Sequence, residues 1–120
     1  MFFPVCRYYR NLLICFDINH TTGEDDMITL IATVKVKAGK MEEAIEVLKE
    51  VVPKIRGAEP GCLAYVPHRV RGEDNTIIFL EKYQDKEALK VHSSNLPKSL
   101  EKFLPLLEPG SDIKTCYEIM

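Results

Sequence analysis

Hydrophobic and polar positions alternate from Ile28 to Lys37, and this alternation predicts a strand. Apolar residues occupy every second position up to Val36 and share one face, while Thr29, Ile31, Thr33 and the lysines share the other. A strand of this kind packs one face against a core and leaves the other accessible. Ala38-Gly39 ends the pattern.

The following segment changes to a helical period. Apolar residues recur at helical spacing from Met41 to Ile55, and charged residues lie on the opposite side. This predicts an amphipathic helix of about four turns. We expect Pro53 to kink or fray its last turn, because proline has no backbone N–H. Glu59-Pro60-Gly61 predicts a turn.

Two further strands are predicted at Cys62–Arg71 and Thr76–Tyr83, joined by a hairpin loop at Gly72–Asn75. On the first strand, Leu63 and Tyr65 share a face. On the second strand, alternation separates Ile78 and Leu80 from Ile77, Phe79, Glu81 and Tyr83.

A pair of short helices is predicted next. Asp85 can cap a helix that runs to about His92, and Ser93-Ser94-Asn95 interrupts it. Pro97 suits the first turn of a second helix, whose apolar stripe extends to Leu107.

Pro109-Gly110 ends that stripe, and alternation from Ile113 to Ile119 predicts a last strand. The order is that of an α+β, ferredoxin-like βαββαβ fold with a four-stranded antiparallel sheet. Its helices lie on one face, so the other face favours a partner, most simply a second copy. Cys62 and Cys116 fall on opposite edges, beyond disulfide reach within one chain.

Residues 1–26 show no periodic pattern and precede the domain, which we place at residues 27–120. The apolar run from Leu12 to Phe16 is short for a signal peptide, and residues 19–26 are polar. The segment is an extension that packs somewhere, a poor targeting segment, or the product of a start site placed ahead of Met27. We favour the last of these, or a disordered arm.

Composition narrows the class of protein. A chain of 120 residues with 46% apolar and 28% charged residues suits one globular domain. A net charge of −2 gives no electrostatic case for nucleic acid, and no apolar run suits a membrane span. The four cysteines form no C-x-x-C pair, and we interpret them as reduced thiols of a cytoplasmic protein.

No phosphate loop, G-x-S-x-G, H-E-x-x-H or EF-hand spacing occurs in the sequence. We therefore expect no metal and no cofactor. An enzyme with this sequence would use general acid–base groups or the reactivity of its substrate.

His92 and Glu81 are candidate catalytic residues because the pattern turns both inward. His92 follows Ala88 by one helical turn, so its ring points at the sheet. It is a neutral core histidine bonded to a carbonyl, or a proton acceptor. Glu81 shares a face with Phe79 and Tyr83, so it needs a partner. Glu81 belongs to a structural ion pair, within one subunit or across two, or it is part of a functional site.

The candidate substrate-binding residues are Tyr65, Phe79, Tyr83 and Asn75. The tyrosines can supply hydroxyl donors on the sheet, with ordinary aromatic packing as the alternative. Asn75 begins the third strand, where a turn residue is the simpler interpretation.

Met27–Met120 resembles the antibiotic biosynthesis monooxygenase domain, particularly small quinol-monooxygenase-like proteins. The matching pieces are MITLIATVKVKAGKMEEA, AEPGCLAY, DNTIIFLEKYQDKEAL and the VHSS around His92. The sequence departs from the family where Tyr83 replaces a frequent tryptophan and where Leu96-Pro97 replaces a second histidine and phenylalanine. Ala32, and the lack of histidine from Pro97 to Leu107, argue against the haem-degrading branch.

The resemblance implies a dimeric α+β barrel with a small apolar pocket in each subunit. It also implies oxygenation of a small aromatic phenol or quinol by dioxygen, without metal, flavin or haem. His92 falls on the family's histidine, and Glu81, Tyr83 and Tyr65 fall on its recurrent sheet positions. Two alternatives remain: an isomerase or tautomerase of a small carbonyl compound, and a non-catalytic dimeric binding or stress protein.

Overall fold

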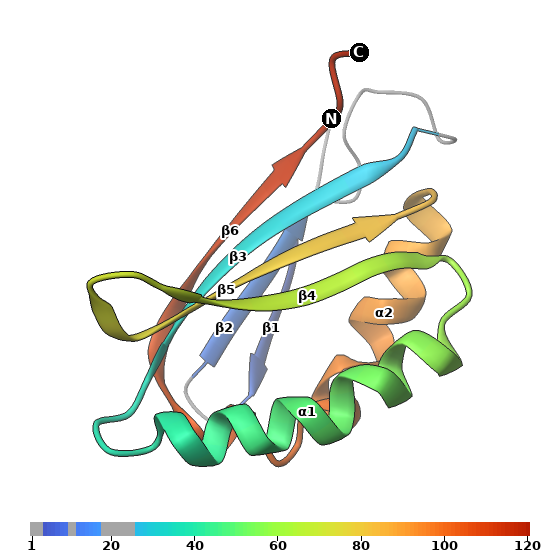
Figure 1. Ribbon diagram of the computed structural model, residues 1–120. Coiled ribbons are helices and arrows are strands. Elements are labelled where there is room, and N and C mark those ends of the chain that lie inside the picture. The colour runs from blue at the N-terminus through green and yellow to red at the C-terminus, as the bar shows by residue number, and fades with distance from the viewer. Residues whose placement is uncertain (1–3, 10–11, 18–25) are drawn as a thin grey trace.

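The computed structural model describes residues 4–9, 12–17 and 26–120. From residue 26 onward it has the expected ferredoxin-like α+β order (Figure 1). The elements are β3 (Ile28–Val36), α1 (Met41–Ala58), β4 (Cys62–Val70), β5 (Glu73–Tyr83), α2 (Lys86–Ser99), a 3₁₀ turn (Leu104–Leu106) and β6 (Leu107–Cys116).

The sheet is antiparallel throughout, with the strand order β4-β5-β3-β6. Both helices lie on the same side of it (Figure 1). On β3 the positions from Ile28 to Val36 that face the helices are buried, whereas the alternate positions are half-buried or exposed. The alternation predicted for this strand is confirmed.

The register across the sheet sets the position of the polar residues. Glu81 on β5 lies between Leu30 on β3 and Tyr65 on β4. Tyr83 lies two residues along β5, opposite Ile28 and Cys62, so its side chain shares the face of Glu81. The helices cover that face, so the Glu81 carboxylate lies in the core.

The predicted pair of helices is wrong, because α2 is one continuous helix from Lys86 to Ser99. Its buried side, which includes Leu89, Ser93 and Leu96, continues through the segment expected to interrupt it. Burial of that side outweighs the weak helix propensity of serine and asparagine, which costs at most about 0.7 kcal/mol per residue. The expected cap is present, since the Asp85 carboxylate accepts the Ala88 N–H at 2.9 Å.

Three other boundaries differ from the sequence prediction. Helix α1 continues past Pro53 to Ala58, because its buried stripe includes Ile55 beyond the proline. The hairpin turn is shorter than expected, and Glu73–Asn75 already belong to β5. Gly72 has a φ of 83°, a left-handed conformation that glycine adopts without strain.

Strand β6 begins at Leu107, so Pro109 and Gly110 lie inside it rather than before it. An edge strand tolerates proline, and the pairing of β3 with β6 shifts register between Val34 and Val36. Strands β4 and β6 form opposite edges of the sheet, as expected for Cys62 and Cys116, and both thiols are free.

A bulge in β4 corrects the predicted face of Leu63. The pairing shifts by one residue between Cys62 and Ala64, so Leu63 is the extra residue and is 44% exposed. Cys62 and Tyr65 are both buried. The expectation that Leu63 and Tyr65 share a face is therefore wrong.

The sheet face without helices carries a small apolar patch. Ile31, Ile78 and Leu80 are half-buried there, and Val66 is 38% exposed. We call these four residues the open-face patch. They are neighbours on β3, β5 and β4, because Leu80 pairs with both Ile31 and Val66.

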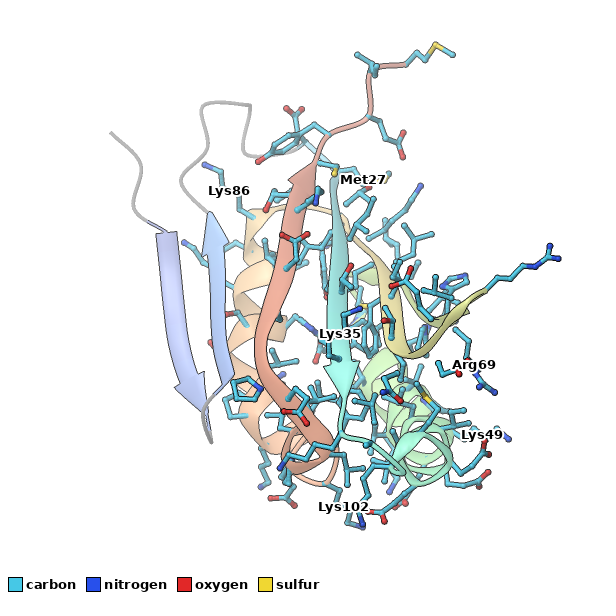
Figure 2. The ribbon with its side chains drawn as sticks, turned by 90° about the vertical axis from the view of Figure 1, so that its left-hand side faces the viewer. Met27, Lys35, Lys49, Arg69, Lys86 and Lys102 are labelled. Carbon is cyan, nitrogen blue, oxygen red and sulfur yellow. The ribbon has the colours of Figure 1, made fainter. Side chains whose placement is uncertain are left out.

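An additional hairpin precedes the domain. Strands β1 (Pro4–Tyr9) and β2 (Leu12–Asp17) pair antiparallel, and β2 lies beside the edge strand β6 without joining its sheet (Figure 2). The sequence pattern did not predict this hairpin. Among the described residues, no helix is both long and apolar enough to cross a membrane.

Candidate active site

His92 is held on the inner side of α2. Leu89 and Leu96 precede and follow it at helical spacing, and both are buried against the sheet. The imidazole is 2% exposed. The predicted inward orientation of His92 is therefore what the structure shows.

Glu59 contacts the imidazole from the end of α1. Its carboxylate Oε1 lies 2.9 Å from His92 Nδ1, and its side chain is 4% exposed. The Glu59 N–H bonds to the Ile55 carbonyl, and the Glu59 carbonyl accepts from Cys62, so the backbone is fixed on both sides. His92 is thus bonded to a carboxylate rather than to a backbone carbonyl.

The sequence analysis missed Glu59 and assigned it only to a turn. A signal was present, because a carboxylate at the C-terminal end of a helix faces the negative end of the helix dipole. An acidic residue at such a position needs a cationic or hydrogen-bond donor partner. Here the partner is a histidine 33 residues further along the chain.

The two ring nitrogens of His92 have different surroundings. An ionised Glu59 can only accept, so Nδ1 must carry the hydrogen of their bond. In the neutral ring this leaves the lone pair on Nε2. Nε2 lies 3.8 Å from Glu81 Oε1, which is beyond hydrogen-bond distance. The geometry thus presents Nε2 as a proton acceptor.

Glu81 is the second buried carboxylate, at 5% exposure. The Tyr83 hydroxyl donates to its Oε1 at 2.6 Å. Burial raises the pKa of Glu81, and Glu59 adds to the rise, while His92 and the Tyr83 hydrogen bond oppose it. The protein environment thus raises the pKa of Glu81 mainly through burial.

Aromatic rings enclose the imidazole. The ring centroids of Tyr65 and Tyr83 both lie 5.1 Å from that of His92. Phe79 lies 5.3 Å from Tyr65 and 5.8 Å from Phe103, extending the row. Burial raises the pKa of both tyrosines, so both phenols are neutral donors.

A cavity of about 50 Å³ adjoins the cluster, between the sheet and α2. His92, Glu81, Tyr65 and Phe79 line it, together with apolar residues that include Ile113 of β6. A ligand pocket typically has about 300–1,000 Å³, so an aromatic ring enters only if the walls move. The space suits a molecule the size of water or dioxygen.

The structure brings together five of the six predicted site residues, namely His92, Glu81, Tyr65, Phe79 and Tyr83. Asn75 is separate from them, since it is exposed near the β4–β5 turn and does not line the cavity. Among residues 26–120, no three histidine, cysteine or acidic side chains are grouped so as to hold a metal ion. Ser93 Oγ, next to His92 in sequence, is buried without a hydrogen-bond partner.

Fold and site together define a small ferredoxin-like α+β protein with a buried acid–base cluster beneath its second helix. The family model of the antibiotic biosynthesis monooxygenases matches residues 27–97, and the chain belongs to that family.

Relatives support this membership. The chain is 33% identical over 94 residues to an uncharacterized protein of Synechocystis, covering 77% of this chain and 63% of that protein. It is 40% identical over 67 residues to "Putative monooxygenase YcnE" of Bacillus subtilis, covering 56% and 70% respectively. The chain thus spans just under two thirds of the length of the Synechocystis relative.

A solved structure supports the fold. It is described as a "putative antibiotic biosynthesis monooxygenase" from Caulobacter crescentus and is 27% identical to this chain. The superposition has a TM-score of 0.73 and covers 81% of this chain and 93% of that structure. The similarity therefore extends over the domain that carries the His92 cluster.

Proposed function

We propose that this protein is a monooxygenase that oxidises a small phenol- or quinol-like aromatic compound with dioxygen and without a cofactor. One observation carries the proposal: His92 is bonded to Glu59 through Nδ1, its Nε2 lies 3.8 Å from Glu81 Oε1, and both His92 and Glu81 line the cavity. Membership in the antibiotic biosynthesis monooxygenase family supports the reaction class.

The chemistry requires a base and an enclosed apolar space. His92 Nε2 takes the phenol proton, and the phenolate becomes electron-rich enough to transfer an electron to dioxygen. The resulting radical and superoxide combine to form a carbon–oxygen bond. Cleavage of the O–O bond leaves a carbonyl on the ring and releases the second oxygen atom as water. The substrate supplies all four electrons, so no external reductant is needed.

The aromatic residues would position the ring. Tyr65 and Phe79 line the cavity, and their neutral, buried surfaces can stack on an aromatic substrate. The Tyr83 hydroxyl donates its hydrogen bond to Glu81, which lines the cavity together with His92. A dry pocket of this kind strengthens each hydrogen bond to the developing anion.

We also propose that the active form is a homodimer. The open-face patch lies on the sheet side without helices, and a second copy would cover it by symmetry. An exposed apolar patch on a sheet face supports this proposal, because such patches favour contact with a partner.

Oxygen consumption tests the proposed reaction. Metal-stripped protein is mixed with a panel of phenols and reduced quinones, and oxygen uptake is followed with product mass. We expect turnover by the wild type and a loss of about 10²–10⁴-fold in kcat for His92→Gln. His68→Ala removes an exposed imidazole whose Nδ1 lies 2.9 Å from the Val66 carbonyl oxygen, and it serves as the matched control. Equal rates for His92→Gln and wild type would contradict the proposal.

A second candidate reaction is isomerisation of a small carbonyl compound. It is favoured by the pairing of a basic imidazole with Glu81, whose raised pKa suits an acid that donates a proton. Turnover under strictly anaerobic conditions would select this reaction over oxygenation. A ligand that raises the melting temperature and yields no product under either atmosphere would indicate a binding protein instead.

A further inference from the structure

We propose that Glu59 is a positioning residue that decides which nitrogen of His92 acts as the base. This inference rests on the proposed function, because it concerns the same imidazole. It goes further by assigning a role to a residue outside the cavity. Glu59 contacts His92 on the side away from Glu81, so it would act through the imidazole and not on the substrate.

The geometry of the contact fixes the ring in two ways. The carboxylate at 2.9 Å from Nδ1 selects the tautomer with hydrogen on Nδ1 and the lone pair on Nε2. The same carboxylate stabilises the imidazolium that forms when Nε2 accepts a proton. Backbone hydrogen bonds at the end of α1 hold Glu59 in place, so the orientation is built into the fold.

Other titratable groups also lie near Glu59 and His92, and each must be considered as a possible influence on which ring nitrogen carries the hydrogen. From the sheet, Glu81 and Tyr83 of β5 face the imidazole, and Tyr65 and Cys62 of β4 lie close by. Burial and the nearby Glu59 and Glu81 raise the pKa of Cys62 to about 11, so this thiol stays neutral. Of the hydrogen bonds and ion pairs found among residues 26–120, the one at Nδ1 is with Glu59, which is therefore the partner that sets the tautomer.

The groove between α1 and α2 contains a residue that can serve as the matched control for Glu59. Glu59 lines a space of about 510 Å³ between α1 and α2, together with Lys54, Lys98, Glu101 and Lys102. Glu101 shares the groove but is exposed and lies outside the His92 cluster. Glu101→Gln removes the same charge from the same groove without altering the imidazole.

Steady-state kinetics give the first arm of the test. For Glu59→Gln we expect kcat to fall roughly 10²–10⁴-fold, the range seen when a group that orients a catalytic imidazole is replaced, with KM changed less than about threefold. The acid limb of the kcat/KM profile should move to lower pH, because the imidazolium loses its ionic partner. Glu59→Asp should recover part of the loss, and Glu101→Gln should match the wild type.

Nitrogen NMR of ¹⁵N-histidine-labelled protein gives a second arm that needs no substrate. We expect the wild-type ring to show hydrogen on Nδ1, and Glu59→Leu, which has no acceptor for that hydrogen, to shift the ring toward the other tautomer. Glu81→Gln, which also removes a carboxylate near the ring, should leave the tautomer unchanged. An unchanged tautomer in Glu59→Leu and an unchanged pH profile in Glu59→Gln would overturn the proposal. A wild type without oxygenase turnover would instead contradict the proposed function, while the NMR result would still decide the role of Glu59.

Discussion

Each face of β5 carries side chains that are unusual for its surroundings. The face covered by the helices is apolar at Ile77 and Phe79, but it also holds Glu81 and the Tyr83 hydroxyl in a buried hydrogen bond. The open face carries Lys82 but also presents Ile78 and Leu80, where a solvated strand face ordinarily has polar residues. The covered face thus keeps polar groups in the core at a cost in stability, as expected if those groups take part in a reaction. The open face keeps aliphatic groups near solvent, which fits contact with a partner.

The largest difference between the faces should appear when neighbouring residues are truncated. Phe79→Ala removes a ring that packs against Tyr65 and Phe103, and we expect the free energy of unfolding to fall by about 3–5 kcal/mol. Leu80→Ala should cost less, and its effect should depend on protein concentration because it acts through the proposed dimer. Urea denaturation at two concentrations separates these outcomes. Equal, concentration-independent losses would contradict the comparison.

A charge on the open face should break the proposed dimer. Leu80→Lys places an ammonium in the open-face patch, where an unpaired buried charge costs several kcal/mol, and we expect a monomer by light scattering. Val91→Lys is the matched control, since Val91 is already 49% exposed on α2. A Leu80→Lys protein with the wild-type mass would show that this face is not the interface.

The covered face also depends on a close approach between α2 and the start of β4. A Cβ at Gly61 would lie 2.5 Å from the Ala88 Cβ, so the helix or the loop must shift in Gly61→Ala. We expect a loss of about 1–3 kcal/mol, measured by urea denaturation. Gly57→Ala is the control, because its Cβ would meet nothing within 4 Å and alanine favours the helix. Equal effects of the two substitutions would remove the steric argument.

The smallest effect should be a pH dependence that arises from Glu81. Burial raises its pKa in the folded protein, so the folded state binds this proton more tightly than the unfolded state does. The resulting stability is present below the ordinary pKa of 4.5 and is lost as pH rises toward the folded-state pKa. The wild type should therefore lose stability relative to Glu81→Gln as pH rises above 4.5. Parallel pH profiles in urea denaturation would show that the burial of Glu81 has no such effect.

Much of the fold follows from periodicity alone. Alternation along β3 and β5 places Glu81, Phe79 and Tyr83 on the covered face, and helical spacing turns His92 inward. These features depend on local geometry, which a single sequence records well.

The missed features depend on tertiary contacts. Packing of α2 overrides the local signal at Ser93-Ser94-Asn95, and the bulge that turns Leu63 outward arises from strand pairing. The partnership of Glu59 with His92 joins residues that are distant in sequence, so no periodic pattern reveals it. The β1–β2 hairpin was missed because its segment lacks the alternation that marks a half-buried strand.

The small volume of the cavity, about 50 Å³, has a consequence for binding affinity. A ring-sized guest must bind a wider conformer than this one, so its apparent dissociation constant equals the intrinsic constant divided by the fraction of molecules that are open. Each 1.4 kcal/mol or so needed for widening weakens apparent affinity about tenfold. Selectivity among ligands would then depend on how far β6 and α2 separate. Substitutions that favour the wider conformer would tighten binding even at positions that do not contact the ligand.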